Sequence, residues 1–414
     1  MFERLAALPR IALLFCSLAL AATPAPAADD TATPAPKGSL VIAGGALRAD
    51  NAQVWQKIVE LAGGPGARIA VFPTAAGNPE RSGRFLAETL ARYGAKAFVV
   101  PLAPRLAGSD VRRAAEDEKI AASVREAGGA FFAGGDQGRI TAALRRPDGA
   151  NSAVLDALWA MYRRGGVIAG TSAGAAIMSS TMFYEGQAPL PTLKNGIADG
   201  RDIAPGLGFI GDEVFVDQHL LVRGRFARML PAMLAKRYKI GLGIDENTAA
   251  VVTRRQDLTV QVIGYKGAIL LDLHQATTDA ARSGFNISGA RISYLDSGDR
   301  YNVKAASFAP GEDKEKIDTP EAPQRAALFA PDILGNTAVV DLLWKLGSSG
   351  QHSATGIAFG APDSATPERG FEFTFTRTPE SEAYESNRAD TYSVYRIRLD
   401  VKPVKLSQPL YQAE

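Results

Sequence analysis

Between residues 166 and 178 the chain reads Gly166-Val167-Ile168-Ala169-Gly170-Thr171-Ser172-Ala173-Gly174-Ala175-Ala176-Ile177-Met178. The apolar first part predicts a buried strand, and the alanine-rich last part predicts the start of a helix. The Gly-x-Ser-x-Gly turn between them is typical of a nucleophile elbow, where small neighbours let a serine occupy a sharp strand-to-helix turn. The positive end of the new helix would favour an oxyanion at that serine. A serine that merely caps a helix is the alternative interpretation of Ser172.

Short apolar runs alternate with helical patterns from residue 38 to about residue 273. The runs rich in Val, Ile and Phe cover residues 39–43, 68–72, 97–100, 130–133 and 167–169. Strands that alternate with helices indicate parallel βαβ units with right-handed crossovers. We therefore expect an α/β fold with a mainly parallel sheet flanked by helices.

A second glycine turn follows a strand of this expected sheet. It reads Gly134-Gly135-Asp136-Gln137 and comes directly after the run at 130–133. Ligands of such sheets bind beyond the carboxyl ends of the strands. The backbone N–H groups of Gly135, Asp136 and Ala173 are therefore candidates for an oxyanion hole, and Gln137 is a candidate for a substrate contact. A plain tight turn is the alternative for the two glycines.

The C-terminal third has a different texture. The segments 258–263 and 268–273 predict a hairpin around Gly264-Tyr265-Lys266-Gly267. Residues 370–376 and 392–399 alternate with period two, which is typical of half-buried antiparallel strands. We expect an α/β domain over residues 38–274 and a β-rich part over residues 275–414, in which the sequence shows no catalytic motif.

The N-terminal residues have the pattern of an export signal. Arg4 and Arg10 come before the apolar run at 11–20, and Ala25-Pro26-Ala27 has the small-x-small cleavage pattern. We expect a signal peptide over residues 1–27, a disordered leader over residues 28–37, and a secreted protein, periplasmic or extracellular, that is not held in a membrane once the signal is removed. A retained N-terminal anchor is the alternative.

Composition excludes several classes of partner and cofactor. The 46 basic and 44 acidic residues are spread along the chain, without a basic stripe interleaved with aromatics, so we expect no nucleic acid partner. Cys16 is the only cysteine and lies in the expected signal peptide, so disulfides and cysteine metal sites are not expected in the mature protein. The sequence has no His and Asp ligand cluster, and we expect neither a metal nor a cofactor.

A serine nucleophile needs a base, and the chain has three histidines. His219 follows an apolar stretch in the expected α/β domain, whereas His274 and His352 lie at or beyond its boundary. A purely structural histidine is the alternative.

Three guanidiniums follow His219 in the chain, those of Arg223, Arg225 and Arg228. They suggest recognition of carboxylates, which arginine can bind by two parallel hydrogen bonds. A solvated basic face is the alternative.

The acid that would orient the base has two candidates. Glu246 follows a short Gly-rich strand whose carboxyl end should face the same crevice, and Glu185 lies between the serine and the histidine in the chain. Chain order does not decide, because catalytic triads occur in several orders. We favour Glu246, because a strand end holds a side chain more firmly than a loop does.

Six segments, in the same order along the chain, resemble the cyanophycinases, a group within the serine peptidase family that also contains the aspartyl dipeptidase peptidase E. The similarity covers about residues 38–305 and rests on these segments: Gly44-Gly45-Ala46-Leu47, Gly134-Gly135-Asp136-Gln137, Gly170-Thr171-Ser172-Ala173-Gly174-Ala175, Asp217-Gln218-His219, Arg223-Gly224-Arg225-Phe226-Ala227-Arg228 and Gly243-Ile244-Asp245-Glu246-Asn247-Thr248-Ala249. The C-terminal part exceeds the usual length of the family, and the segment around Glu185 matches weakly.

The resemblance implies a class I glutamine amidotransferase-like or flavodoxin-like fold and a secreted exopeptidase. Its substrate would be cyanophycin, multi-L-arginyl-poly-L-aspartate, cut at the aspartyl backbone to β-Asp-Arg dipeptides through an acyl-enzyme. Ser172 would be the nucleophile and His219 the base. The family pattern implies a homodimer and a substrate pocket lined by Gln137, Asp217, Gln218, Arg223, Arg225 and Arg228.

Two other functions fit the same residues. One is an aspartyl dipeptidase of the peptidase E type, which has no use for a pocket that holds a branched arginyl polymer. The other is a protein without catalytic activity that captures an acidic polymer through its arginines. Cleavage of the polymer, compared with cleavage of an unbranched Asp-Xaa dipeptide, distinguishes these functions.

Overall fold

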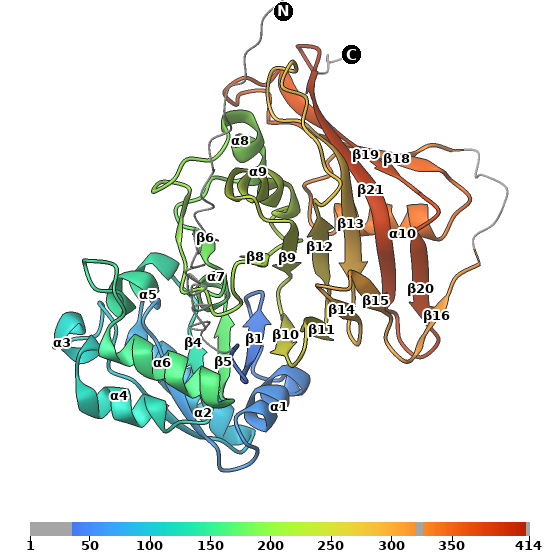
Figure 1. Ribbon diagram of the computed structural model, residues 1–414. Helices are drawn as coiled ribbons and strands as arrows, with labels where there is room; N and C mark the ends of the chain where they lie inside the picture. The colour runs from blue at the N-terminus through green and yellow to red at the C-terminus, as the bar shows by residue number, and fades with distance from the viewer. Residues whose placement is uncertain (1–34, 319–325, 411–414) are drawn as a thin grey trace, which may run out of the picture. The chain divides into compact units, whose positions relative to one another are not determined.

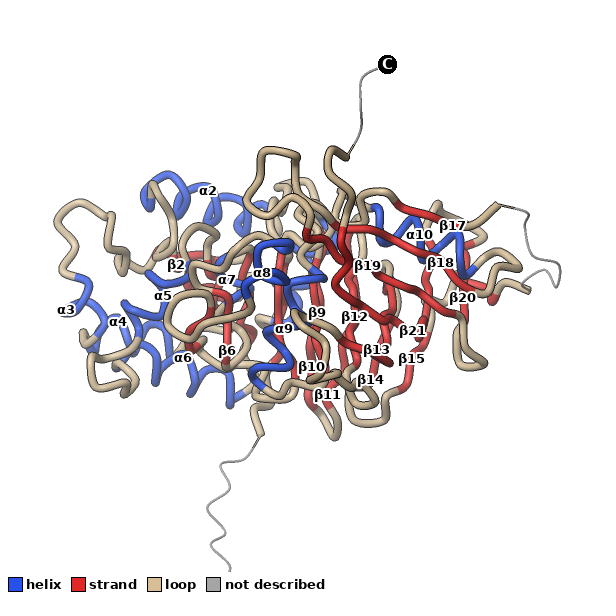
Figure 2. Tube along the Cα trace, turned by 90° about the horizontal axis from the view of Figure 1, so that it is seen from above, coloured by secondary structure: helices blue, strands red, loops and turns tan. Residues whose placement is uncertain are grey.

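The computed structural model of the protein describes residues 35–318 and 326–410 (Figure 1). Most strands of these residues belong to two large β-sheets. The expected signal peptide and residues 28–34 of the expected leader lie outside the described residues. Figure 2 shows helices gathered around the parallel strands of the first sheet, whereas strands dominate the second sheet. A separate two-stranded sheet pairs β6 (Thr181–Phe183) with β7 (Ile203–Pro205).

The first sheet has nine strands and is parallel in one half. Its parallel strands, in sheet order, are β1 (Ser39–Ala43), β5 (Val167–Thr171), β4 (Gly129–Phe132), β2 (Arg68–Phe72) and β3 (Lys96–Val99). Helices connect these strands, as the alternating pattern predicts. The α/β class predicted from the sequence is confirmed in this half of the sheet.

The other half of the first sheet is antiparallel, which corrects the expectation of a mainly parallel sheet. It continues from β1 through β10 (Thr248–Arg254), β11 (Leu258–Gly264), β14 (Arg300–Asn302) and β15 (Ser307–Ala309). Only residues 255–257 connect β10 to β11. So short a connection permits antiparallel pairing alone, because a parallel crossover needs a dozen or more residues.

Helices bury both faces of the parallel strands. On β1, Leu40 and Ile42 belong to one apolar cluster, and Val41 and Ala43 to another. The first cluster includes residues of α4 (Glu118–Arg125), α5 (Gln137–Leu144) and α6 (Ala153–Arg164), with the short α3 (Val111–Ala115) beside them, and the second those of α1 (Ala52–Leu61) and α2 (Pro79–Arg92). Burial on both faces explains why these strands are nearly continuous apolar runs.

The second sheet has ten strands and is largely antiparallel. In sheet order its main path runs through β17 (Leu328–Ala330), β18 (Ser353–Ala358), β19 (Arg369–Thr376), β21 (Tyr392–Lys405), β13 (Ile287–Leu295), β12 (Ala268–Asp272), β9 (Ile240–Ile244) and β8 (Val214–Gln218). β20 (Glu382–Ser386) pairs with β21 and with β16 (Lys314–Lys316). The strands predicted at 370–376 and 392–399 are confirmed as β19 and β21.

One apolar cluster joins the second sheet to α8 (Pro189–Asn195), α9 (Phe226–Lys236) and α10 (Ala338–Gly347). The hairpin predicted between 258–263 and 268–273 is wrong. β11 pairs with β10 and β14 in the first sheet, whereas β12 pairs with β9 and β13 in the second. The glycine turn between them therefore carries the chain from one sheet to the other.

The predicted change of texture near residue 275 falls inside the second sheet. β12 ends at Asp272 and pairs with β13, which begins at Ile287. Strands from both sides of residue 275 thus share one hydrogen-bonded sheet, and the described residues from Ala35 onward belong to one compact unit. The sequence pattern indicates which residues form each strand, but it does not indicate which strands pair.

Candidate active site

Ser172 occupies a strained turn between β5 and α7 (Ala173–Ala176). Its backbone angles are φ 54° and ψ −111°, a conformation that costs a non-glycine residue about 1–3 kcal/mol. The flanking glycines are required by close approach. A Cβ atom on Gly170 would lie 2.3 Å from the carbonyl oxygen of Gly174, and one on Gly174 would lie 2.4 Å from that of Phe132. The turn exposes the hydroxyl at the carboxyl end of β5.

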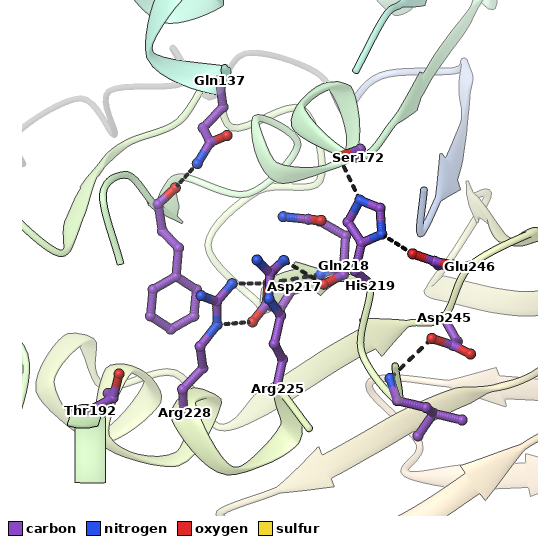
Figure 3. Close-up of polar contacts among 12 residues, drawn as sticks. Gln137, Ser172, Thr192, Asp217, Gln218, His219, Arg225, Arg228, Asp245 and Glu246 are labelled. Atoms are coloured by element: carbon purple, nitrogen blue, oxygen red, sulfur yellow. Dashed lines mark hydrogen bonds and ion pairs between the residues drawn. The ribbon is translucent and has the colours of Figure 1, made fainter. Parts of the chain in front are cut away.

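His219 follows β8 and points its ring at this hydroxyl (Figure 3). The distance from its Nε2 to Ser172 Oγ is 2.8 Å. The backbone of His219 has φ 51°, and its N–H donates to the carbonyl oxygen of Gly44 at 2.7 Å. His219 therefore follows a strand of the second sheet, whereas Ser172 follows a strand of the first sheet.

Glu246 lies on the other side of the imidazole. Its Oε1 is 2.6 Å from Nδ1 of His219. A carboxylate accepts hydrogen bonds and does not donate them, so Nδ1 carries the proton and Nε2 is left to accept from the serine hydroxyl. The other candidate acid, Glu185, is exposed, and no hydrogen bond joins it to His219. The structure thus brings Ser172, His219 and Glu246 together and leaves Glu185 outside.

The environment of His219 favours the neutral form of its imidazole. Burial is the largest influence and lowers the pKa of His219 below its ordinary value. The positive charges of Arg223 and Arg225 lower this pKa further, while the hydrogen bond to Glu246 acts in the opposite direction. A neutral imidazole can accept a proton, which is what a general base requires.

Arg228 and Asp217 form a buried ion pair close to His219. The guanidinium Nε is 2.7 Å from Oδ2 of Asp217 and Nη2 is 2.8 Å from Oδ1 (Figure 3). Only 4% and 1% of the two side chains are exposed, and the guanidinium lies 3.9 Å from the ring centre of Phe183. Both predicted substrate residues are therefore already paired with each other, in a bidentate geometry that fixes the N-terminal part of α9.

The other two predicted arginines are less enclosed. Arg225 donates from Nη1 to the carbonyl oxygen of Gln218 at 2.8 Å, and burial lowers its pKa to about 10. Arg223 is exposed and forms no ion pair with the residues that the structure describes. Of the three guanidiniums, Arg223 is the one most available to a ligand.

Two glutamines complete the surroundings. Gln137 donates from Nε2 to the carbonyl oxygens of Phe183 and Tyr184, both at 2.9 Å, and so links α5 to the chain after β6. Gln218 is buried, and its Oε1 has no hydrogen-bond partner within the described parts of the chain. A buried acceptor without a partner is costly, so this oxygen is suited to receive an N–H group from a ligand.

The predicted oxyanion donors divide into two groups. The N–H of Ala173 is the first of α7 and has no acceptor within that helix. Gly135 lies beside the turn at Ser172, because a Cβ on the preceding Gly134 would be 3.2 Å from Cβ of Ser172. The N–H of Asp136, in contrast, donates to the carbonyl oxygen of Ala75 at 3.0 Å. This bond contradicts the prediction for Asp136, because one N–H group makes one strong hydrogen bond.

Sequence reasoning missed two positions at the site. A Cβ atom on Gly45 would lie 2.2 Å from Cε1 of His219, so the imidazole packs directly on the glycine backbone. Asp245 is fully buried and accepts at Oδ1 from the N–H of Leu221 at 3.0 Å, which fixes the loop after the histidine. The adjacent acids at 245 and 246, directly after a strand, are the sequence signal that was available for Asp245.

Residues 35–318 and 326–410 contain neither a group of metal ligands nor a helix suited to span a membrane. In this part of the chain, no three His, Cys, Asp or Glu side chains are grouped so that they could hold a metal ion. None of the helices described there has the length and apolar character that crossing a membrane requires.

Comparison with known proteins identifies the family. The model of peptidase family S51 matches residues 40–260. The cyanophycinase of Geminocystis herdmanii is 33% identical over 276 residues, which are 64% of this chain and 93% of that protein. The cyanophycinase of Trichormus variabilis is 30% identical over 282 residues, 66% of this chain and 87% of that protein.

Among solved structures, the crystal structure of a peptidase from an acI-B1 Actinobacterium matches with a TM-score of 0.42 and 23% identity. The match covers 56% of this chain and 90% of that chain. The family match spans more than half of the 414 residues, and the cyanophycinases align over most of their own length. The chain therefore belongs to peptidase family S51 and is a serine peptidase.

Proposed function

We propose that this serine peptidase hydrolyses cyanophycin at its aspartyl backbone and releases β-Asp-Arg dipeptides. The observation that carries the proposal is the continuous hydrogen-bonded chain from Ser172 through His219 to Glu246, next to a group of arginines. Relatives that align over 93% and 87% of their length are cyanophycinases. The substrate and the site agree chemically, because the polymer carries both carboxylates and guanidiniums.

In the proposed mechanism, Nε2 of His219 takes the proton of the Ser172 hydroxyl while Oγ attacks a backbone carbonyl carbon. Glu246 holds the imidazole in the reactive tautomer and stabilises the imidazolium. The tetrahedral oxyanion accepts hydrogen bonds from the N–H groups of Ala173 and Gly135. His219 then returns the proton to the leaving amine, and water resolves the acyl-enzyme by the same steps in reverse.

The proposal also covers the turn at Ser172, the fold of the first sheet, export and the oligomeric state. We assign the turn at Ser172 as a nucleophile elbow, since its positive φ and its required glycines are what such a turn needs. The parallel half of the first sheet supports a flavodoxin-like core of the class I glutamine amidotransferase type. Residues 1–27 support export of the protein, and the family resemblance supports a homodimer.

Recognition of the substrate would use the groups that the structure leaves available. Arg223 offers an exposed guanidinium for a carboxylate of the polymer. The unpaired Oε1 of Gln218 offers an acceptor for an arginyl guanidinium of the polymer. The buried pair of Asp217 and Arg228 would hold these groups in position without contacting the substrate itself.

Purified protein tests the proposal on cyanophycin, with the products identified by mass spectrometry. We expect β-Asp-Arg dipeptides from the wild type and a loss of at least about 10⁴-fold in turnover for Ser172→Ala. Ser109→Ala, a serine outside the site, serves as the control. Wild-type turnover by Ser172→Ala would reject the mechanism, and a preference for an unbranched Asp-Xaa dipeptide would reject the substrate.

A further inference from the structure

A cavity of about 520 Å³ lies where the second sheet meets the loop between β14 and β15. Five cationic side chains line it: Arg237, Lys239, Arg291, Lys304 and Arg396. Asp212, Glu213 and Asp272 are the acidic residues of the lining, and His274 lies beside them. Positive groups therefore outnumber negative ones, and both signs are present.

This cavity is separate from the catalytic site. Ile240, the first residue of β9, lines it, whereas Glu246 follows the other end of the same strand. From Ile240 to Ile244 the strand rises about 13 Å, at roughly 3.3 Å per residue. β12 runs antiparallel to β9 and brings Asp272 opposite Ile240. The two sites thus lie at opposite ends of the strands that they share.

Two arginines of the cavity come from the centre of the second sheet. Arg291 of β13 and Arg396 of β21 are 14% and 18% exposed, and they approach the carboxylate of Glu380 at 3.6 Å and 3.2 Å. One carboxylate cannot neutralise two guanidiniums. In addition, Nε of Arg291 is buried and has no hydrogen-bond partner in the parts of the chain that the structure describes. A buried donor without a partner is a reason to expect a ligand that accepts hydrogen bonds.

Two further cations lie at the rim. Arg237 and Lys239 are exposed and form no ion pair with any described residue. His274 and Glu213, in contrast, are already engaged: His274 Nδ1 is 2.7 Å from Oδ1 of Asp272, and Glu213 pairs with Arg254. Lys304 pairs with Asp257, and Asp212 forms no ion pair with a described residue. The charge left unpaired around the cavity is therefore positive only by a small margin, through Arg237 and Lys239.

We infer that this cavity is a second binding site for carboxylates of a polymeric substrate, and that it raises the affinity of the enzyme for long chains. The inference rests on the proposed function, which supplies a polymer with a carboxylate on every repeat. The nearby acidic residues suit the guanidiniums of the same polymer. Arg237 and Lys239 lie inside the segment 40–260 that matches the family, whereas Arg291, Lys304 and Arg396 lie beyond it, so the cavity combines residues from both parts of the chain.

The proposed second site predicts that the kinetics depend on the length of the polymer substrate. An extended backbone spans at most about 3.3–3.6 Å per residue, so about four or more backbone residues are needed to cover the length of β9 alone. A substrate of two repeats reaches one site only. A long polymer reaches both, and the second contact then acts at a high effective concentration. Loss of the second site should therefore change the KM for long chains and leave short substrates unaffected.

The test uses the variant Arg237→Gln/Lys239→Gln, because both residues are exposed and no folding defect is expected. Arg113→Gln/Lys119→Gln is the matched control, since it removes one arginine and one lysine that are likewise exposed and form no ion pair with described residues. We expect an increase in KM on the order of five-fold for long cyanophycin, with kcat and the turnover of a two-repeat substrate unchanged. The increase should shrink at high salt.

A binding measurement separates this inference from the proposed function. Protein with Ser172→Ala, which does not consume its ligand, is titrated with long cyanophycin and with inorganic phosphate, with and without the cavity substitutions. Weaker polymer binding in the cavity variant supports the site even if the wild type fails to cleave cyanophycin. Equal polymer affinity for both proteins overturns it, as does a cavity that responds to phosphate alone.

Discussion

The imidazole of His219 packs against the backbone of Gly45, so that a Cβ atom at this glycine would lie 2.2 Å from Cε1 and 2.4 Å from Nε2 of the histidine. Gly45 has φ +119°, and it follows β1 directly after Gly44, whose carbonyl oxygen accepts from the N–H of His219. The first sheet thus supports both Ser172, through β5, and His219, through the end of β1. His219 itself follows a strand of the second sheet.

Gly45→Ala should therefore displace the imidazole from Ser172. A shift of about 1 Å in a catalytic group reduces the rate on the order of 10²-fold. We expect kcat for cyanophycin to fall by about this amount, because no rotation of the ring relieves a contact with both Cε1 and Nε2. Steady-state kinetics measure the loss.

Backbone strain would accompany this change and must be separated from it. Gly165 has a similar φ of +125°, but nothing lies within 4 Å of the position of its Cβ. Gly165→Ala is therefore strained to a similar degree without touching the site. We expect both variants to have lower melting temperatures and only Gly45→Ala to lose activity; equal kcat values for the two would show that the contact with His219 is unimportant.

Glu246→Gln should test the assignment of the acid. An amide in place of the carboxylate no longer holds the proton on Nδ1 of His219, and the imidazole loses its reactive tautomer. We expect kcat to fall about 10²- to 10⁴-fold with little change in the fold. Glu185→Gln makes the same chemical change at an exposed glutamate and should leave kcat unchanged. The reverse pattern would assign the acid to Glu185.

Local sequence predicted the parts of the site that depend on local geometry. The pattern around Ser172 correctly placed a strand, a turn and a helix, since apolar runs and flanking glycines are properties of neighbouring residues. His219 is a candidate because the chain has few histidines and because it follows an apolar stretch in the expected α/β domain, and the structure places it beside Ser172. Glu246 follows β9, which is parallel to β8, so the carboxyl ends of these two strands bring it to the same imidazole.

What the sequence did not predict depends on pairing between distant segments. β11 and β12 look like one hairpin, yet they belong to different sheets: β11 pairs with β10 in the first, and β12 pairs with β9 in the second. The N–H of Asp136 looked available, but Ala75, from another strand end, accepts it. The contact of Gly45 with His219 likewise joins residues far apart in the chain. Periodicity carries no information about such contacts.

Arg228→Gln should lower stability more than it changes recognition. Removal of the guanidinium leaves the buried Asp217 with only the more distant Arg225, whose Nη1 is 3.8 Å from Oδ1, as a counter-charge, which lowers the free energy of unfolding by about 3 kcal/mol. Arg223→Gln removes an exposed guanidinium and should change the free energy of unfolding by less than about 0.5 kcal/mol. Urea denaturation compares the two variants. Similar stabilities would contradict a structural role for the buried pair.

Combining Arg228→Gln with Asp217→Asn tests whether the two side chains of the pair depend on each other. The double variant has no buried charge at this position, so it should be more stable than the sum of the two single changes predicts. An additive result would show that the two side chains do not depend on each other.

Arg223→Gln should move the acid limb of the pH profile to higher pH. A positive charge near an imidazole disfavours its protonated form, and Arg223 contributes in this way to the lowered pKa of His219, after the larger effect of burial. Without Arg223 the pKa of His219 rises, so its imidazole becomes protonated at a higher pH than in the wild type. The acid limb of kcat/KM reports the base in the free enzyme and should move with it.

Arg223→Lys keeps the charge and should leave the limb near its wild-type position, while Arg113→Gln removes an exposed charge from α3 as a control. High salt screens the interaction and should reduce the difference between wild type and Arg223→Gln. The ring protons of His219, followed by NMR in the free enzyme, report the same pKa without turnover. A limb that stays fixed, or that moves to lower pH, would mean that Arg223 does not act on His219 through its charge.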